Sequence, residues 1–559
     1  MSSSGHRQAN PAALDRNLLV VAPPGCGKTE LLARRAEALI PSLKPGQRIL
    51  ALTFSNKAKA NLRGRLLDVL GSERVRRHIT IHNFHGHAGE IIRSHAATLD
   101  APANIEFAEK HTQRDAIEPY LEGLSENEAN EHRSRLETQL RVAKQGPFSD
   151  LNVLGRLRAL QDPRAFDIED HRQRGDVLFF DDLLRNAQRL LRVPEISRLY
   201  QAHYGALLVD EFQDLSPQQL DIALRSCSTS RTFVGDPLQG IYSWTGARPD
   251  LVERLLRRIS GDPAGLGVSY RSSPRVLTLL GTVTVKLGGQ ALTPHDADSW
   301  FEGGVAAGAR FKTGCDEAGF IRSLAHEIMA HQPQATIGII CRSGWRRKPI
   351  DAEFAASDTP CTRWELALDS SHVMDTLKRA LSALGGEATA AQLRDEVRAA
   401  LGPGDADTIA EAMDAIDQLE AIAGPSRSMA TAILDVRESE DPDAAIPAGV
   451  HLLNAHTGKG QQFDWVIIPG VEQGNVPSFL ARTAEALDEE HRVLLVMLSR
   501  ARHGALITYS DSLISKKNKP YNTTPSPWLS ELREGLHTDG EGMLEHIRRM
   551  ARHDSTDNT

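Results

Sequence analysis

A loop near the start of the chain carries the residue types that bind phosphate. Residues 22–29 read Ala-Pro-Pro-Gly-Cys-Gly-Lys-Thr, which departs from the P-loop pattern only at its first position, where alanine replaces glycine. Gly25 and Gly27 let the backbone turn its N–H groups toward an anion, and the positive end of the following helix adds to the attraction. In this pattern Lys28 reaches the β- and γ-phosphates and Thr29 ligates Mg²⁺. The other expected nucleotide contacts of the loop are Pro24, Cys26 and Glu30.

An acidic pair farther along the chain supplies the second part of this chemistry. Asp210 and Glu211 directly follow the apolar run ALLV, so they stand at the carboxyl end of an expected buried strand. Asp210 is placed to hold Mg²⁺ through water, and Glu211 is placed to orient or deprotonate the water that attacks a phosphate. Solvated carboxylates at strand ends are common, and a glycine-rich turn before a helix need not bind anything. Together, the loop and the pair predict hydrolysis of a nucleoside triphosphate.

Apolar runs that alternate with helical patterns would position these groups. The runs lie at 17–22, 48–54, 79–84, 177–184, 206–212 and 232–236 in the first half, and at 336–343, 466–470 and 494–499 in the second. Strands and helices at this spacing predict parallel sheets covered on both faces. Residues 95–175 and 365–447 have a helical composition instead, and the end after about 536 is polar and expected to be disordered. The predicted fold class is α/β, with two parallel-sheet cores, each interrupted by a mainly helical insertion.

Composition narrows the class of protein further. The five cysteines form no CxxC pair, so we expect neither a zinc site nor a disulfide framework. The N-terminus has no apolar leader segment, and no apolar run approaches the roughly 18 residues of a membrane span. We therefore expect a cytoplasmic protein with no membrane partner. The net charge of −8 weakly opposes nucleic acid as a partner, although affinity depends on where the basic residues lie.

Two segments closely resemble motifs II and III of the UvrD/Rep/PcrA superfamily 1 helicases. They are Asp-Glu-Phe-Gln-Asp at 210–214 and VGDPLQGIYSWTGA at 234–247. Further matches run in family order: LTFSNKAK (52–59), TIHNFH (80–85), VLFFDDLL (177–184), SYRSS (269–273), NAHTGKGQQFDWVIIPG (454–470), EEHRVLLVMLSRAR (489–502) and PSPWLSEL (525–532). The resemblance implies two RecA-like domains with ATP hydrolysis in the cleft between them. The implied boundaries are 1–94 and 176–262 for domain 1A, 95–175 for insertion 1B, 263–349 and 448–536 for domain 2A, 350–447 for a reduced insertion 2B, and 537–559 for a polar tail.

The same resemblance implies roles for residues outside the phosphate loop. Gln8 would read the adenine, Tyr270 would stack on it, and Gln462 would hold the ribose. Gln239 would touch the γ-phosphate and couple it to the nucleic acid. Arg271 and Arg500 would act as arginine fingers from the second core, where a guanidinium neutralises the charge that develops during phosphoryl transfer. For each arginine, a surface salt bridge is the alternative role.

Aromatic and polar residues after the expected strands are the candidates for gripping nucleic acid. Stacking of bases on aromatic rings holds single strands with little sequence preference. Phe84 could equally be a core residue, and each histidine could equally be a structural hydrogen-bond partner. The candidates are Phe54, Asn56, His82, Phe84, Tyr242, Trp244, Asn454 and His456.

Four positions depart from the family pattern. Glu30 replaces an arginine, Thr245 replaces the arginine of motif III, Asn454 replaces a threonine, and Gln462 replaces the glutamate that holds the ribose. None of these changes touches the phosphate loop lysine, the acidic pair or the two arginines. We therefore expect ATP hydrolysis to survive, with looser nucleotide selectivity.

The resulting function is an ATP-dependent DNA helicase or single-strand translocase, 3′ to 5′ by resemblance, with ATP and Mg²⁺ as cofactors and single-stranded or tailed DNA as partner. The short insertion at 350–447 supports an alternative, a DNA-stimulated ATPase subunit that senses DNA ends and regulates a partner nuclease. Such compact chains are similar to the helicase-like subunit of the Gabija anti-phage system, so antiviral defence stands beside DNA repair. A degenerate binding module conflicts with the complete ATP motifs, and a small-molecule kinase leaves the motifs after residue 240 unexplained.

Overall fold

The computed structural model forms two compact units. The first extends to Leu266, and the second comprises Gly267–Thr559 together with the loop residues Pro23–Cys26. The structure describes residues 17–99, 106–107, 116–121, 124, 126–160, 162–175, 177–242, 246–357, 359–364, 371–385, 388–401, 412–413, 415–416, 419–420, 428–433, 446–515 and 519–557.

The first unit is built on a six-stranded parallel sheet in the order β3-β2-β6-β7-β1-β8. Its strands are β1 (Asn17–Val21), β2 (Arg48–Thr53), β3 (Ile79–Asn83), β6 (Tyr204–Asp210), β7 (Arg231–Gly235) and β8 (Ala264–Gly265). Because all strands point the same way, the loops that follow β1, β6 and β7 emerge at one edge. Val21 is in register with Gly235, and Asp210 with Val234, so this edge brings the phosphate loop to the acidic pair.

Helices bury the sheet because its strands are apolar on both faces, as parallel strands usually are. The apolar core of the first unit includes Leu50, Leu207 and Phe233 from the strands and Ile91 and Leu190 from the helices. The helices are α1 (Lys28–Leu39), α2 (Asn56–Leu70), α3 (Ser72–His78), α4 (Phe84–Ser94), α9 (Phe180–Leu191), α10 (Pro194–His203), α11 (Pro217–Ser226) and α12 (Pro249–Ser260).

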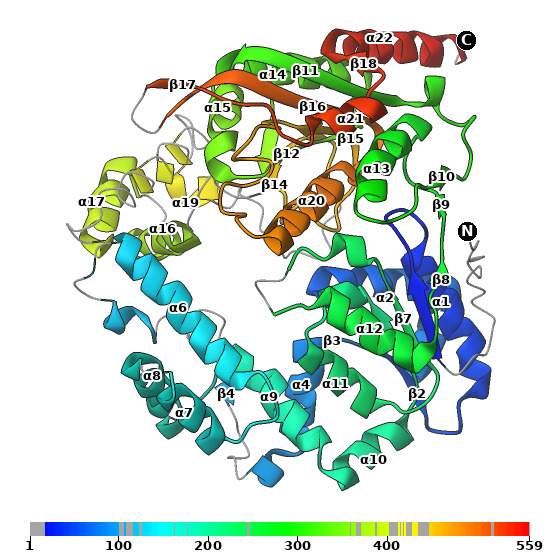
Figure 1. Ribbon diagram of the computed structural model, residues 1–559, viewed down its shortest axis with the longest axis vertical. Helices are drawn as coiled ribbons and strands as arrows, with labels where there is room; N and C mark the ends of the chain where they lie inside the picture. Colours follow the sequence, from blue (N-terminus) through cyan, green and yellow to red (C-terminus); the bar gives the residue numbers. More distant parts are fainter. Residues whose placement is uncertain are drawn as a thin grey trace. The chain divides into compact units, whose positions relative to one another are not determined.

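The first insertion packs around a small core of its own. It contains α6 (Glu126–Lys144), α7 (Asp150–Arg158) and α8 (Pro163–Arg174), drawn in cyan in Figure 1. Leu136 and Leu140 of α6 meet Val153 of α7 and Ile168 of α8, all of them fully or nearly fully buried. A short strand before α6, β4 (Glu106–Phe107), pairs with β5 (Val177–Leu178), which lies between α8 and α9 in the chain.

The second unit has a larger sheet in the order β13-β14-β12-β15-β16-β11-β18. Its strands are β11 (Val305–Thr313), β12 (Thr336–Cys341), β13 (Cys361–Arg363), β14 (Gly449–Asn454), β15 (Phe463–Ile468), β16 (Ala501–Ile514) and β18 (Thr538–Asp539), with β17 (Pro520–Asn522) antiparallel to β16. Its helices are α13 (Pro274–Lys286), α14 (Gly314–His331), α15 (Gly344–Ala355), α20 (Ala484–Leu498), α21 (Leu529–Gly535) and α22 (Gly540–Asp557). Both predicted α/β cores are therefore present.

The second insertion also has its own core. Its described helices are α16 (Ser371–Leu384), α17 (Ala390–Leu401) and α19 (Met429–Ala432). Val373 and Leu377 of α16, Leu393 and Val397 of α17, and Met429 of α19 share one buried apolar cluster. The insertion begins later than expected, because the end of α15 and all of β13 fall within 350–447, and β13 pairs with β14 in the second sheet.

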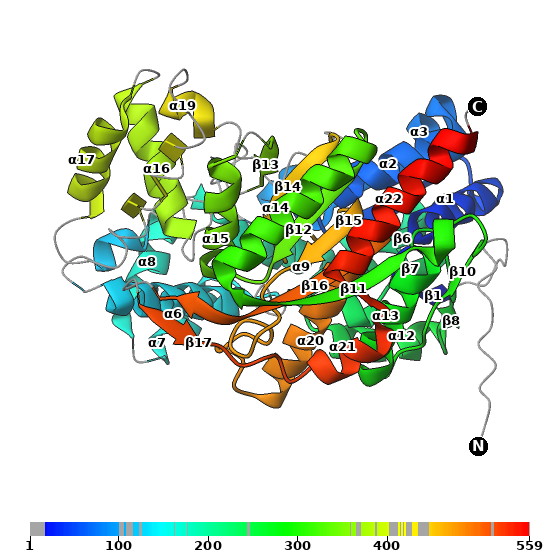
Figure 2. The same ribbon diagram turned by 90° about the horizontal axis from the view of Figure 1, so that it is seen from above.

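Two further boundary expectations are corrected. The first sheet includes β8, so its unit continues past residue 262. The tail after 536 is not a disordered end over its described residues: β18 pairs with β11, and α22 lies along α14 (Figure 2). Met543, Ile547 and Met550 of α22 are buried in the core of the second unit, since their spacing places them on one helix face. Within the part of the chain that the structure describes, no helix combines the length and apolar character needed to cross a membrane.

Candidate functional site

The phosphate loop depends on two glycines with left-handed backbone. Gly25 has φ 77° and Gly27 has φ 80°, a region that side chains with a Cβ adopt at a cost. Gly27 caps α1, whose first residue is Lys28. The N–H of Ala22 donates to the carbonyl of Gly235 at 2.9 Å, which ties the start of the loop to the end of β7. The backbone thus places Lys28 at the positive end of a helix, beside the ends of the central strands.

Three carboxylates surround the Lys28 ammonium. Lys28 Nζ lies 3.1 Å from Glu211 Oε2. Burial alone would lower the pKa of Lys28, but the surrounding carboxylates outweigh burial and raise that pKa above its ordinary value. Burial and the neighbouring Glu211 raise the pKa of Asp210 to about 7, and burial likewise raises the pKa of Asp236.

This excess of buried negative charge fits a hard cation. Asp210 is 5% exposed, Asp236 is 2% exposed, and their oxygens are the ligand type that Mg²⁺ prefers. Thr29, half-buried in the first turn of α1, supplies a hydroxyl oxygen one residue after Lys28. The residues present therefore fit a Mg²⁺-bound triphosphate. Thr29 and Asp210 would hold the metal, which would shield phosphate charge.

Glu211 has a strained backbone. Its φ of 54° and ψ of 51° lie in the left-handed region, which a non-glycine residue occupies at a cost of about 1–3 kcal/mol. The Glu211 N–H donates to Asp210 Oδ1 at 3.0 Å, and Gln213 Nε2 donates to Glu211 Oε2 at 2.8 Å. These bonds hold the Glu211 carboxylate toward Lys28 in spite of the strain.

Gln213 and Asp236 are two site residues that the sequence did not single out. Gln213 is fully buried, and its Oε1 accepts from the Asp236 N–H at 2.9 Å. A Cβ at Gly235 would clash with the Gln213 side chain, so only glycine fits beside it. Gln239 Nε2 donates to Asp236 Oδ2 at 2.8 Å. The structure thus joins Glu211 to the predicted γ-phosphate sensor Gln239 through Gln213 and Asp236, and their place inside motifs II and III was the available signal.

The remaining loop residues have local partners. Glu30 forms ion pairs with Arg34 and with Arg65, and these arginines lower the pKa of Glu30 against the effect of burial. Cys26 is buried, and its thiol lies 3.9 Å from the carbonyl oxygen of Pro24. Glu30 therefore points to a surface ion-pair network formed with α2. The predicted adenine contact Gln8 lies outside the described residues.

In the second unit, the two predicted arginine fingers converge on Ser499. Arg271 Nη1 donates to the Ser499 carbonyl at 3.3 Å, and Arg500 Nη2 donates to Ser499 Oγ at 2.6 Å. Arg500 also donates to the carbonyls of Val496 and Gln461, at 2.9 and 3.3 Å. Neutral oxygens thus orient both guanidiniums. The sequence separates these arginines by more than two hundred residues, yet the fold brings them together.

Two more predicted nucleotide contacts lie on the surface of the second unit. Tyr270 is 63% exposed, with its ring 4.4 Å from the ring of His295 between centroids. Gln462 is exposed. Both side chains are accessible to a ligand.

In the first unit, Phe54 and Tyr242 form a stacked aromatic pair. Their ring centroids are 5.4 Å apart and their planes differ by 19°. Both residues follow strands of the first sheet at its carboxyl edge, and both are half-buried. Asn56, at the start of α2, accepts from Asn83 Nδ2 at 2.7 Å. A partly exposed aromatic pair beside polar side chains suits the stacking of bases.

Comparison with known proteins identifies the family. The UvrD/REP helicase N-terminal domain matches residues 4–259, and the UvrD-like helicase C-terminal domain matches residues 406–512, together more than half of the chain. The chain belongs to the UvrD/Rep/PcrA-type superfamily 1 helicases. Relatives from this family are named ATP-dependent DNA helicases.

The relatives of this UvrD-like chain differ in how much of it they cover. The ATP-dependent DNA helicase Rep of Escherichia coli K12 is 32% identical over 275 residues, 46% of the chain and 40% of Rep. DNA helicase II of the same strain is 23% identical over 642 residues, 96% of the chain and 88% of that protein. The PcrA helicase of Staphylococcus aureus strain MRSA252 is 22% identical over 657 residues, 94% of the chain and 86% of PcrA. The chain thus spans less than half of Rep.

The DNA contacts predicted for this UvrD-like chain have mixed outcomes. Phe84 is fully buried in the core of the first unit, so the expectation that its ring stacks on bases is corrected. It is the first residue of α4, and an apolar residue there packs against the sheet. Trp244 and the motif III departure Thr245 lie outside the described residues.

The two predicted histidine contacts are held in hydrogen-bonded or buried surroundings. His82 Nε2 lies 3.0 Å from Glu90 Oε2, and burial lowers the pKa of His82. Burial and the nearby Arg342 lower the pKa of His456 to about 4, so its imidazole is neutral at neutral pH. A neutral imidazole can donate one hydrogen bond to a phosphate but adds no charge. Asn454, the last residue of β14, is half-buried next to this loop.

Proposed function

We propose that this chain is a motor that hydrolyses ATP to move 3′ to 5′ along single-stranded DNA in the cytoplasm and to displace the complementary strand. The observation that carries the proposal is the group of Lys28, Glu211, Asp210 and Asp236, linked to Gln239 through Gln213. The polarity rests on the resemblance of the motifs to the UvrD/Rep/PcrA family.

In the proposed mechanism of ATP hydrolysis, Glu211 and the phosphates compete for Lys28. In the structure Lys28 neutralises Glu211 across 3.1 Å. When a triphosphate occupies the loop, its β- and γ-phosphates attract the ammonium, since they carry more charge than one carboxylate. Glu211 is then released to accept a proton from the attacking water. Substrate binding itself therefore activates the base.

Arg271 and Arg500 supply the second part of the catalytic charge in this proposal. The fold of the second unit orients both guanidiniums through neutral oxygens around Ser499. A preoriented guanidinium stabilises charge that develops on a transferring phosphoryl group. Because these arginines stand on the second core, ATP would draw on both cores and hydrolysis would release one of them.

The proposed binding of DNA depends on the Phe54–Tyr242 pair. A base stacked on such a ring contributes roughly 1–3 kcal/mol and does so for any sequence. Tyr242 lies three residues after Gln239, which bonds Asp236 of the ATP site. A movement of this segment would shift the aromatic pair. This short connection is the route by which ATP hydrolysis would act on the bound strand.

Strand displacement on tailed duplexes tests the proposed activity. We expect ATP-dependent displacement from a duplex with a 3′ single-stranded tail and little from one with a 5′ tail. Lys28→Ala should abolish displacement while leaving the protein folded. Displacement from the 5′-tailed duplex alone would overturn the polarity. If neither tail supports displacement, and the protein also fails to remove streptavidin from biotinylated single strands, the motor function is wrong.

A second candidate, a regulator of a partner nuclease, draws on one observation. The alignment with DNA helicase II occupies 642 positions, more than the 559 residues of the chain, so the chain lacks segments that this relative has. Under this alternative the chain hydrolyses ATP in response to DNA ends but displaces little duplex by itself. Strand displacement or DNA cleavage that appears only with a co-purified protein would favour the regulator. Processive unwinding by the isolated chain would exclude it.

A further inference from the structure

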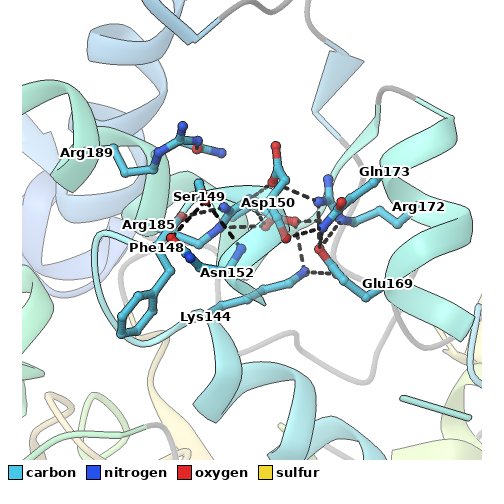
Figure 3. Close-up of polar contacts among 12 residues, drawn as sticks. Lys144, Phe148, Ser149, Asp150, Asn152, Glu169, Arg172, Gln173, Arg185 and Arg189 are labelled. Carbon is cyan, nitrogen blue, oxygen red and sulfur yellow. Dashed lines mark hydrogen bonds and ion pairs between the residues drawn. The ribbon is translucent and has the colours of Figure 1, made fainter. Parts of the chain in front are cut away.

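Six charged side chains gather where the first insertion joins the first sheet. We call them the junction cluster: Lys144, Asp150, Glu169, Arg172, Asp182 and Arg185. Figure 3 labels all of them except Asp182. Lys144 ends α6, Asp150 begins α7, Glu169 and Arg172 lie on α8, and Asp182 and Arg185 lie on α9. The three helices of the insertion are thus all tied to one helix of the core.

Lys144 and Asp182 form the centre of the cluster. Lys144 Nζ lies 2.9 Å from Asp182 Oδ2 and 2.8 Å from Glu169 Oε2, the latter as an ion pair without hydrogen-bond alignment. Arg185 Nη2 donates to Asp182 Oδ1 at 2.8 Å and to Asp150 Oδ1 at 2.6 Å. Arg172 Nη2 bonds Glu169 at 2.6 Å.

The cluster is balanced in charge, and five of its six side chains are buried, whereas the Asp150 side chain is 50% exposed. The Lys144 side chain is 1% exposed, and those of Glu169, Asp182 and Arg185 are fully buried. Three positive groups face three negative ones. Burial alone would raise the pKa of Asp182, but Lys144 and the two arginines hold it well below its usual value. Five of the six charged side chains therefore lie in a part of the protein that has little water.

Stability alone is a weak reason for such a cluster. Replacing a buried ion network by apolar side chains of similar volume is often neutral or stabilising, because removing charges from water is costly. Ion networks differ from apolar contacts in that their bonds have fixed directions. Here the bonds fix the last residue of α6, the first residue of α7 and one side of α8 against α9. An apolar contact would not define one orientation in this way.

Residues at the end of α6 also lie next to the segments that carry motifs II and III. Gln218 Nε2, on α11, donates to the Lys144 carbonyl at 3.3 Å, and α11 begins three residues after Asp214 of motif II. A Cβ at Gly246, in motif III, would lie 2.9 Å from Nε2 of the Gln145 side chain. Residues 144 and 145 are therefore in contact with the segments that follow both Glu211 and Gln239.

We propose that the junction cluster is a coupling device. It holds the helical insertion in a single orientation on α9, so that DNA held by the protein acts on motifs II and III through Lys144 and Gln145. Lys144, Glu169 and Asp182 are positioning residues in this account and touch neither ATP nor DNA. The inference rests on the proposed function, because it concerns stimulation of ATP hydrolysis by DNA.

Removal of a neutral pair separates coupling from stability. Lys144→Met alone leaves a net negative charge buried, so we expect a lower melting temperature. Lys144→Met with Glu169→Met restores the balance of the cluster, and we expect most of the melting temperature to return. The orientation is no longer fixed in that double variant. The ratio of ATPase rates with and without oligo(dT) should therefore fall about fivefold or more, with the DNA-free rate and the KM for ATP unchanged.

A matched control removes an exposed neutral pair from the same unit. Arg198 and Glu195 of α10 form an ion pair with both side chains 70% exposed. Arg198→Met with Glu195→Met should leave the stimulation ratio at the parental value. The ratio is taken within one sample, so a partly unfolded fraction cancels and a less stable double variant still gives a decisive result.

The possible results separate the two levels of the proposal. A fallen ratio in the buried-pair variant, with the exposed-pair variant unchanged, supports the coupling role. A buried-pair variant that keeps the parental ratio overturns it and leaves the cluster purely structural, while the proposed motor stands. A parent protein that hydrolyses ATP without any response to DNA overturns the proposed function, and the inference with it.

Discussion

Two charged groups in the first unit, each buried in part, differ in their balance of charge. Around Lys28, three carboxylates face one ammonium, and the pKa of Asp210 rises to about 7. In the junction cluster three cations face three carboxylates, and the pKa of Asp182 is lowered. The group around Lys28 would bind an added cation and a phosphate, whereas the charges of the junction cluster neutralise one another. An imbalance of buried charge thus indicates a ligand site, and a balance indicates a structural or positioning role.

The largest expected effect comes from removing the base on the unbalanced side. Glu211→Gln keeps the shape of the side chain and the bond to Gln213 but cannot accept a proton. We expect kcat for ATP hydrolysis to fall by about 10²–10⁴-fold. The steady-state rate of ATP hydrolysis with single-stranded DNA measures this fall in kcat. The melting temperature should hold or rise, because one of three crowded carboxylates has become neutral. A large loss of stability in this variant would break the comparison.

On the balanced side, a single deletion should act on stability. Asp182→Asn leaves Lys144 and Arg185 short of a counter-charge in a buried region. Breaking a buried ion network in this way costs about 3–5 kcal/mol in the free energy of unfolding. Denaturant unfolding at neutral pH measures this cost. The pKa of Asp182 is lower in the folded state, so the stabilisation it provides is present above the unfolded pKa and is lost as pH falls through the folded pKa. An Asn variant as stable as the parent at pH 7 would contradict the account.

Asp210 predicts the opposite pH dependence. Its pKa of about 7 lies above the unfolded value, so folding favours the protonated acid, and the charged form opposes folding as pH rises. Asp210→Asn should therefore stabilise the nucleotide-free protein by about 4 kcal/mol at pH 8, a gain that grows between about pH 4 and pH 7. Thermal unfolding across this range checks the sign. A variant that is destabilised at pH 8 would show that Asp210 is balanced in the folded protein.

The smallest expected effect concerns the neutral link within the unbalanced group. Gln213→Ala removes the bonds to Glu211 and to the Asp236 N–H. We expect kcat for ATP hydrolysis to fall about tenfold with little change in KM, since Gln213 orients the base and does not bind ATP. A rise in KM with an unchanged kcat would instead assign Gln213 to nucleotide binding.

The local motifs made the grouping of the proposed ATP-site residues predictable from sequence. Lys28 and Asp210 each follow an apolar strand of a parallel sheet, and parallel strands bring such loops to one edge. The contacts between distant segments were not predictable in this way. Lys144 and Asp182 lie 38 residues apart in the chain, in segments whose composition resembles ordinary solvated helices. No periodic pattern marks their pairing.

Other differences between prediction and structure have local causes. The terminal helix α22 was hidden by its polar composition, although Met543, Ile547 and Met550 have the spacing of one helix face. Phe84 directly follows a strand, as the half-buried Phe54 does, but Phe84 begins a helix that packs on the sheet. Sequence position alone could not separate these two settings.

Hydrolysis of ATP by the purified chain, measured with and without oligo(dT), tests the central claim most directly. The account predicts Mg²⁺-dependent hydrolysis that single-stranded DNA stimulates and that Lys28→Ala abolishes. Hydrolysis that is absent with every DNA supplied, or that persists unchanged in Lys28→Ala, would contradict it.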